Sequence, residues 1–227
     1  MSVTISMRQY LSIGHLSAAA LFASQCKEIE AMAQATPIDS PQRRQHNACA
    51  ISSVIVSTAF LEATINEMFS DCADNHSTER IAALPARNLM ANLWRKGIPR
   101  TASYPIIEKY EIALELNGKP TFNTGASPYQ DVKMLIELRN ALIHYEPETI
   151  VGYSGHETPQ LHKFEKRLKG KFLINTLTGL GNPFYPDKVL GAGCAQWAVS
   201  TAVAFTDDFF QRLGITPTYE HVRATYL

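Results

Sequence analysis

An apolar stripe in residues 40–70 constrains the fold more than any other feature of this chain. Its members recur at alternating steps of four and three residues: Asn47, Ile51, Val54, Thr58, Leu61, Ile65 and Met68. This spacing places them along one side of an α-helix, as in the seam of a packed helical bundle. Ser40-Pro41 predicts the start of this helix, with Ser40 as N-cap and Pro41 at the first helical position.

Three further segments have the length and periodicity of bundle helices, namely residues 5–35, 127–146 and 187–213. Together with 40–70 they predict an all-α fold, a four-helix up-and-down bundle, in a single domain over residues 1–227. Two insertions interrupt the core helices. Residues 71–126 are expected to contain short helices at about 79–95 and 104–117, and residues 147–186, rich in Gly and Pro, a long loop or a small hairpin. The tail 215–227 is expected to be loosely attached.

The overall charge gives no field that would attract nucleic acid. Lys+Arg and Asp+Glu both number 21, so the formal net charge is zero. Binding to RNA or DNA would therefore have to come from a local patch. The run from Lys163 to Lys171 is such a patch, and its basic members are Lys163, Lys166, Arg167, Lys169 and Lys171. Runs of this kind are more often solvated faces than binding sites.

The four cysteines predict neither a metal site nor a disulfide framework. Cys26, Cys49, Cys72 and Cys194 include no close pair, and the seven histidines include no His-x-x-x-His pair. We therefore expect no metal, no cofactor and free thiols in the reducing cytoplasm. Helical periodicity in residues 11–33 favours a mature helix over a signal peptide, and the polar residues within 189–205 argue against a membrane span.

The most informative chemistry lies in residues 127–146. Ser127, Pro128 and Gln130 predict an N-cap, a proline at the first helical position and a capping box. On a helical wheel, apolar residues lie within roughly 100° of Arg139 on either side. They are Val132, Leu135, Ile136, Leu138, Leu142 and Ile143. A guanidinium inside an apolar arc is costly unless something pairs with it.

Two interpretations of this helix remain open from the residues alone. In the first, Arg139, Asn140 and His144 form a site, because Asn140 and His144 are four residues apart and share the neighbouring face. In the second, Arg139 pairs with a structural carboxylate such as Glu62, and His144 only ends the helix. Spacing alone favours the second interpretation.

Segments of three predicted helices carry a resemblance to a known family. Leu138-Arg-Asn-Ala-Leu-Ile-His-Tyr145 resembles the Arg-x-x-x-x-His signature of the HEPN superfamily, the higher eukaryote and prokaryote nucleotide-binding domains. Phe60-Leu-Glu-Ala-Thr-Ile-Asn-Glu-Met-Phe69 is similar to an earlier helix of bacterial members, where an acidic residue and an Asn recur four residues apart, here Glu62 and Asn66. The last helix, with Ala195-Gln-Trp-Ala-Val and Phe209-Phe-Gln-Arg-Leu-Gly214, is also similar to that of such proteins.

The resemblance implies a HEPN-like bundle and, for many members, a metal-independent endoribonuclease, often a toxin or phage-defence effector. Such proteins commonly form homodimers in which two motifs face each other. On one helix Arg139 and His144 are about 140° apart, too far for one tight pair, so a two-fold dimer would complete the site. The implied catalytic residues are Arg139, His144 and Asn140, and Glu62 is the expected partner of Arg139 in the free protein.

Tyr145 raises the question of a protein antitoxin. Some HEPN toxins are silenced when a partner nucleotidyltransferase modifies a tyrosine two residues after the His, but here Tyr145 follows His144 directly. Packing at the helix end is the simpler role for it. The alternative to a ribonuclease is a non-catalytic HEPN module that binds nucleotide or protein. A third reading is a helical scaffold in which Arg139 only forms a buried ion pair.

Overall fold

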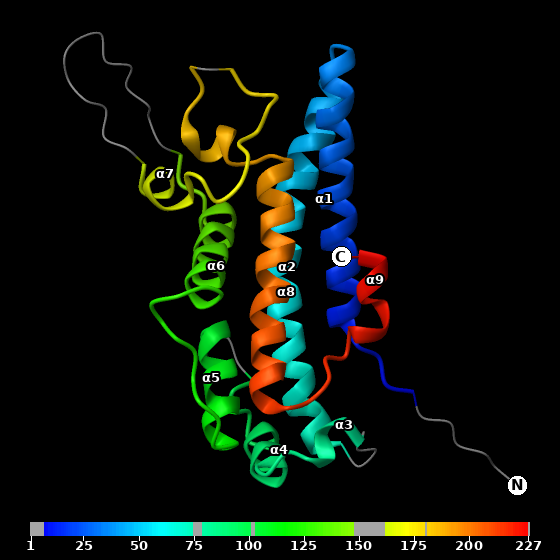
Figure 1. The fold of residues 1–227 in the computed structure, drawn as a ribbon, viewed down its shortest axis with the longest axis vertical. Coiled ribbons are helices and arrows are strands. Elements are labelled where there is room, and N and C mark those ends of the chain that lie inside the picture. The colour runs from blue at the N-terminus through cyan, green and yellow to red at the C-terminus, as the bar shows by residue number, and fades with distance from the viewer. Residues whose placement is uncertain (1–6, 75–78, 101–102, 148–161, 180, 227) are drawn as a thin grey trace, which may run out of the picture.

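The computed structural model confirms an all-α bundle. It describes residues 7–74, 79–100, 103–147, 162–179 and 181–226. Four helices form the body: α1 (Leu11–Ala35), α2 (Ser40–Ala73), α6 (Tyr129–Ile143) and α8 (Ala192–Leu213). They alternate in direction along the chain (Figure 1). The arrangement is therefore the expected up-and-down topology.

The shorter elements lie at the two ends and along one side of the body. At the lower end of Figure 1 are α3 (Glu79–Ala82), α4 (Arg87–Arg95) and α5 (Ile106–Leu116). At the upper end are α7 (Lys163–Leu168) and the turn η1 (Phe184–Lys188), and η2 (Glu220–Val222) and α9 (Arg223–Tyr226) follow α8. No strand occurs in the described residues. Within the second insertion, 148–161 lie outside the described residues.

Helices α1, α2 and α8 pack closely because small residues line their contact. Ala19, Ala50, Ala195 and Ala198 are fully buried there. The hydroxyl of Ser53 lies 3.1 Å from the carbonyl oxygen of Ala19 and 3.2 Å from that of Ala195. One small polar side chain thus contacts the backbones of both neighbouring helices, which is feasible only where the helices approach each other closely.

Aromatic side chains fill the other half of the core. Tyr110 of α5 packs edge-to-face against Phe205 and Phe209 of α8, with ring centroids 5.0 and 4.7 Å apart. Its hydroxyl donates a 2.6 Å hydrogen bond to the carbonyl oxygen of Leu61. The α2 stripe is confirmed from Val54 to Met68, but Asn47 is exposed and its expected place in the seam is wrong. His46, Cys49, Ala50 and Ser53 are buried there instead.

Helix starts differ from the predicted caps. Asp39, not Ser40, is the N-cap of α2; its carboxylate accepts from the backbone N–H of Gln42, whose side chain bonds back in a capping box. At α6 the expected capping box is absent. The Ser127 hydroxyl bonds to the side chain of Asp131. Both corrections are of one or two residues and leave the helices in place.

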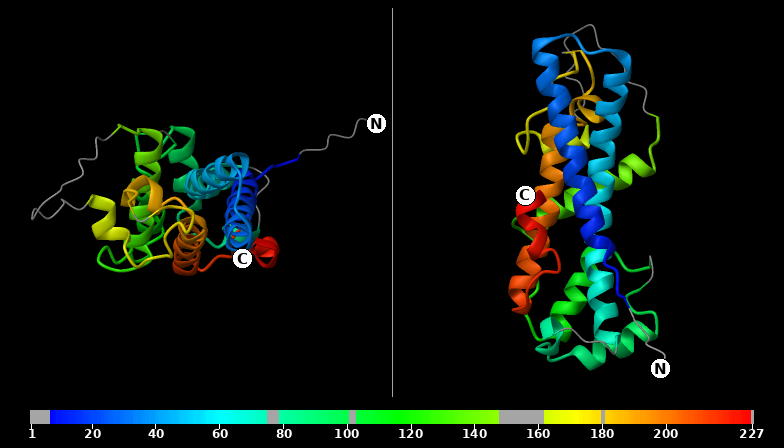
Figure 2. Two further views of the ribbon diagram at one scale, coloured as in Figure 1. Left: turned by 90° about the horizontal axis from the view of Figure 1, so that it is seen from above. Right: turned by 90° about the vertical axis from the view of Figure 1, so that its right-hand side faces the viewer.

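The expectation of a loose tail is wrong. Tyr219 is fully buried, and its hydroxyl lies 2.7 Å from Thr206 Oγ1 and 2.8 Å from Asp207 Oδ1. Arg223 donates to both carboxylate oxygens of Asp207 at 2.9 and 2.8 Å. The tail is thereby fastened to α8, and α9 lies against α1 (Figure 2).

Among the described helices, only α2 has the length and apolar composition of a membrane span. Just over half of its most apolar window, 56%, is buried inside the bundle. A helix at the centre of a bundle meets the same criteria because its partners cover its apolar surface. The feature is therefore weak evidence for a membrane.

Candidate functional site

The packing of α6 decides which of its side chains are exposed. Val132, Met134, Leu135 and Leu138 are buried against α2 and α8. Arg139 lies at the border of this buried side and is half-buried, whereas Asn140 is exposed. Arg139 was expected inside the apolar arc, whereas the structure places it at the edge of the buried side and only half-buried.

His144 lies just beyond the helix. It is the C-cap residue, with φ −103° and ψ 46°, and its backbone N–H donates a 2.8 Å hydrogen bond to the carbonyl oxygen of Asn140. The helix therefore ends three residues before the expected boundary of 146, at Ile143. The imidazole is exposed, as a group that exchanges protons with a ligand must be.

No hydrogen bond or ion pair joins Arg139 to another residue in the described part of the chain. The expected partner, Glu62, is engaged elsewhere, so the predicted Glu62–Arg139 pair is wrong. Lys109 of α5 donates to Glu62 Oε1 at 2.8 Å and to Asn66 Oδ1 at 3.3 Å. Glu62 and Asn66 thus act together, as their spacing suggested, but on a buried lysine rather than on Arg139.

Lys109 is the residue that sequence reasoning missed. Its side chain is fully buried, while that of Glu62 is 38% exposed. In the sequence Lys109 falls between Glu108 and Tyr110 in a short amphipathic helix, and no spacing rule links it to a residue 47 positions away. Only the packing of α5 against α2 brings the pair together.

Tyr145 belongs to an aromatic cluster at the end of α6. Its ring is 48% exposed and lies 6.4 Å from the ring of Tyr185. Tyr185 stacks on His162, with centroids 5.0 Å apart and planes at 13°. His162 Nδ1 accepts the N–H of Phe164 at the start of α7. The structure therefore brings a second imidazole to the end of α6 that carries His144, and no sequence signal predicted it.

The basic run 163–171 is only partly free to bind phosphate. Arg167 pairs with Glu137 of α6, and Lys171 pairs with Asp131 of the same helix. Burial by itself would raise the pKa of Asp131, but the hydrogen bonds from Lys171 and Ser127 hold it below its usual value. Lys163, Lys166 and Lys169 are exposed and form no ion pair with another residue that the structure describes. Two of the predicted contacts therefore serve to dock the run on α6.

A shallow groove of about 520 Å³ lies between α5 and α6. It is lined by Pro105, Ile106, Ile107, Glu108, Glu111, Tyr129, Lys133, Ile136 and Glu137. Three carboxylates face one ammonium there, and phosphate groups would be repelled. The groove is therefore a poor binding surface for nucleic acid.

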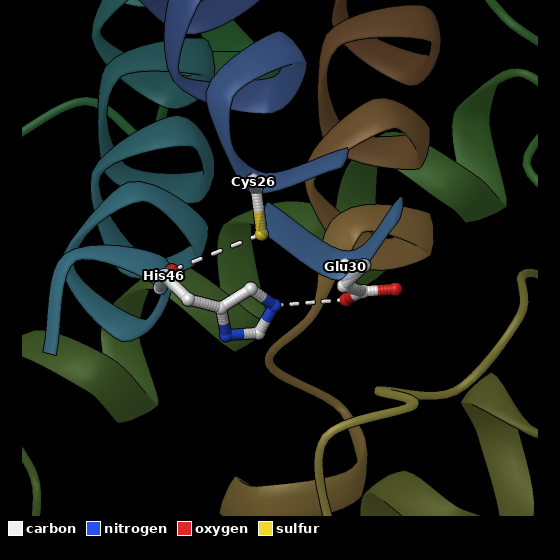
Figure 3. A group of neighbouring side chains, drawn as sticks. All are labelled: Cys26, Glu30 and His46. Atoms are coloured by element: carbon white, nitrogen blue, oxygen red, sulfur yellow. Dashed lines mark hydrogen bonds and ion pairs between the residues drawn. The ribbon is translucent and has the colours of Figure 1, made fainter. Parts of the chain in front are cut away.

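A second cluster of chemistry-bearing side chains is buried in the bundle. Cys26 and Glu30 of α1 meet His46 of α2, and their ligating atoms all lie within 4.8 Å of one another (Figure 3). Burial raises the pKa of the Cys26 thiol to about 12. Burial would also raise the pKa of Glu30, but hydrogen bonds from His46 and from the N–H of Ala192 lower it. The sequence gives no sign of this cluster, because its cysteine and its histidine each lie alone and come from different helices.

A scan against protein-family models finds no matching family, and searches of the curated proteins and of the solved structures find no matching chain. The arrangement at the end of α6 must therefore be judged on its own chemistry. It offers an always-charged fork of N–H donors, an amide and a titratable ring within one and a half helical turns.

Proposed function

We propose that this chain is a HEPN-type, metal-independent endoribonuclease whose site is completed by a second copy of the chain. The observation that carries the proposal is Arg139, a half-buried cation with no partner among the described residues, beside the exposed Asn140 and His144. A partly desolvated guanidinium is suited to an anion that arrives from outside, and its forked donors fit phosphate.

The chemistry follows from these residues. A histidine acting as base takes the proton of a ribose 2′-hydroxyl, and the 2′-oxygen attacks the adjacent phosphorus. Arg139 stabilises the negative charge that develops on the phosphoryl oxygens. A protonated histidine gives its proton to the departing 5′-oxygen. The products are a 2′,3′-cyclic phosphate and a free 5′-hydroxyl, with no net gain or loss of atoms.

The division of roles between base and acid supports a dimer. One His144 cannot face both sides of the same phosphate, but two copies related by a two-fold axis can. Ile143 and Tyr145, 49% and 48% exposed, lie on either side of His144. Contact between two α6 ends would cover both of these side chains while leaving the imidazoles at the edge of the contact.

RNA cleavage in EDTA tests the proposal. Purified wild-type protein is expected to cut single-stranded RNA to products with cyclic phosphate ends and to leave the DNA of the same sequence intact. His144→Ala is expected to lose about 10²- to 10⁴-fold in rate, the typical contribution of an acid–base group. His221→Ala is the matched control, because His221 is also exposed but lies in η2, within the tail.

Two results would count against a ribonuclease. If His144→Ala cuts RNA at the wild-type rate, the activity belongs to another site or another protein. If folded wild-type protein cuts no RNA but binds nucleotide, and Arg139→Ala abolishes that binding, the chain is a non-catalytic HEPN module. A protein antitoxin would be sought as a partner that covers Tyr145 only if the chain cleaves RNA.

A further inference from the structure

Three ligand-type side chains converge where the upper ends of α1 and α2 face the start of α8. His46 Nε2 lies 2.8 Å from Glu30 Oε1, and the Cys26 thiol lies 3.8 Å from the carbonyl oxygen of His46 (Figure 3). Cys26 and Glu30 are one helical turn apart and share a face of α1, so the helix itself fixes their spacing. The fold of α2 back along α1 adds the imidazole.

The donor set is that of a zinc site. Thiolate, imidazole and carboxylate bind Zn²⁺ at about 2.3, 2.0 and 2.1 Å, so neighbouring ligand atoms of a tetrahedral site are about 3.3–3.6 Å apart. Here the three atoms are already within 4.8 Å of one another. Small side-chain adjustments would therefore suffice to surround an ion, with water as the fourth ligand. The softness of sulfur and nitrogen disfavours Mg²⁺ and Ca²⁺.

The surroundings hold the carboxylate in place. Glu30 Oε1 accepts the backbone N–H of Ala192 at 2.7 Å, and Glu30 Oε2 accepts the hydroxyl of Thr176 at 3.1 Å. Oε2 keeps a further lone pair, and the second lone pair of Oε1 is the one that faces His46 Nε2, so it becomes free for ligation when that nitrogen binds the ion. Outer-shell bonds of this kind orient the ligands of protein metal sites.

A simpler role accounts for two of the three residues. Glu30 and His46 form an ion pair, and Glu30 also satisfies an N–H in the first turn of α8. That role does not involve Cys26, whose side chain is fully buried and whose thiol, among the described residues, makes only a long contact to the carbonyl oxygen of His46.

We propose that Cys26, Glu30 and His46 bind a Zn²⁺ ion, which ties α1 and α2 together and, through Glu30, the start of α8. Binding releases the thiol proton of Cys26 to solvent, and His46 ligates the ion through Nε2 as a neutral ring with its proton on Nδ1. The centre contains none of the residues of the α6 site. Its loss would therefore lower stability without removing a group from the proposed reaction.

Cobalt titration of the full-length chain after EDTA treatment and dialysis tests the site. We expect one Co²⁺ per chain, with a thiolate-to-cobalt absorption band, displacement by Zn²⁺ and a rise in melting temperature on zinc binding. Cys26→Ser should abolish the band. His46→Gln should weaken metal binding by more than about 100-fold, because the loss of an outer-shell partner alone typically costs about 10- to 100-fold. Cys72→Ser is the control, because it removes a buried thiol at the other end of α2 and should leave the cobalt band unchanged.

Measurements on the wild-type protein test the zinc site even if a variant does not fold. X-ray absorption of the zinc-loaded chain should show one sulfur at about 2.3 Å in the first shell. Failure of the wild type to bind Zn²⁺ at micromolar concentration, a first shell without sulfur, or an unchanged cobalt band in Cys26→Ser would each overturn the proposal. The cluster would then be an ion pair that caps α8.

Discussion

Lys109 and Arg139 are two cations in the same bundle with opposite surroundings. Lys109 is fully buried and bonded to both Glu62 and Asn66. Arg139 is half-buried and has no partner among the described residues. The comparison shows that the cation inside the bundle is paired with a carboxylate, whereas the cation near the end of α6 is not paired with any described residue. An anion-binding site requires the second arrangement, whereas the first only maintains the structure.

The largest effect on stability is expected from Glu62→Ala. It leaves the Lys109 ammonium buried without its carboxylate, and breaking a buried pair in this way costs about 3–5 kcal/mol. Urea denaturation measures the loss, with Glu115→Ala, an exposed carboxylate of α5, as control. A cost below about 1 kcal/mol would mean that water reaches Lys109 and that the contrast with Arg139 is smaller than the structure indicates.

A smaller loss, about 1 kcal/mol, is expected from Lys109→Met. The remaining Glu62 is 38% exposed and can be hydrated, and Met fills most of the volume of the lysine stem. The same denaturation experiment compares the two variants, with Lys133→Met as a surface control. If Lys109→Met is as destabilising as Glu62→Ala, the cost of Glu62→Ala does not come from leaving a buried ammonium without its carboxylate.

Arg139→Met should change stability by less than about 1 kcal/mol, because no ion pair with a described residue is lost. RNA cleavage should nevertheless fall by about 10²- to 10³-fold, the usual effect of removing a donor that stabilises transition-state charge. Measuring both quantities on one preparation separates the two roles. A large loss of stability with intact cleavage would make Arg139 a structural residue like Lys109.

The smallest effect concerns the pairing of the basic run with α6. The pKa of Asp131 is lowered from its ordinary value of 3.8 by its bonds to Lys171 and Ser127. Its contribution to stability is therefore present above about pH 4 and is lost as the pH falls below that value. Asp131→Asn should be slightly less stable than wild type at pH 7, and the two should converge as the pH falls below the lowered pKa of Asp131. Parallel pH profiles would show that the Lys171 contact does not stabilise the fold.

The sequence predicted the helices better than the contacts between them. Hydrophobic periodicity predicted α2, because the buried side of a long helix appears in the sequence as apolar residues at steps of three and four. It also predicted the end of α8 at Gly214, whose φ of 74° suits a residue without a side chain. Contacts between helices depend on how the helices pack, and no sequence pattern predicts them. Examples are Lys109 with Glu62 and Cys26 with His46. The tail was predicted wrongly because two of its side chains, Tyr219 and Arg223, bind α8 through contacts that the sequence does not reveal.

The carboxylate that satisfies the first turn of α8 comes from a residue 162 positions earlier in the chain. Neighbouring residues supply the start of α2 with its cap, but α8 has no side-chain cap of its own at Gly191. Ordering of the beginning of α8 must therefore await the docking of α1, and closing so long a loop is entropically slow. The α1–α2 hairpin can form from local contacts first, so we expect α8 to join the bundle late in folding.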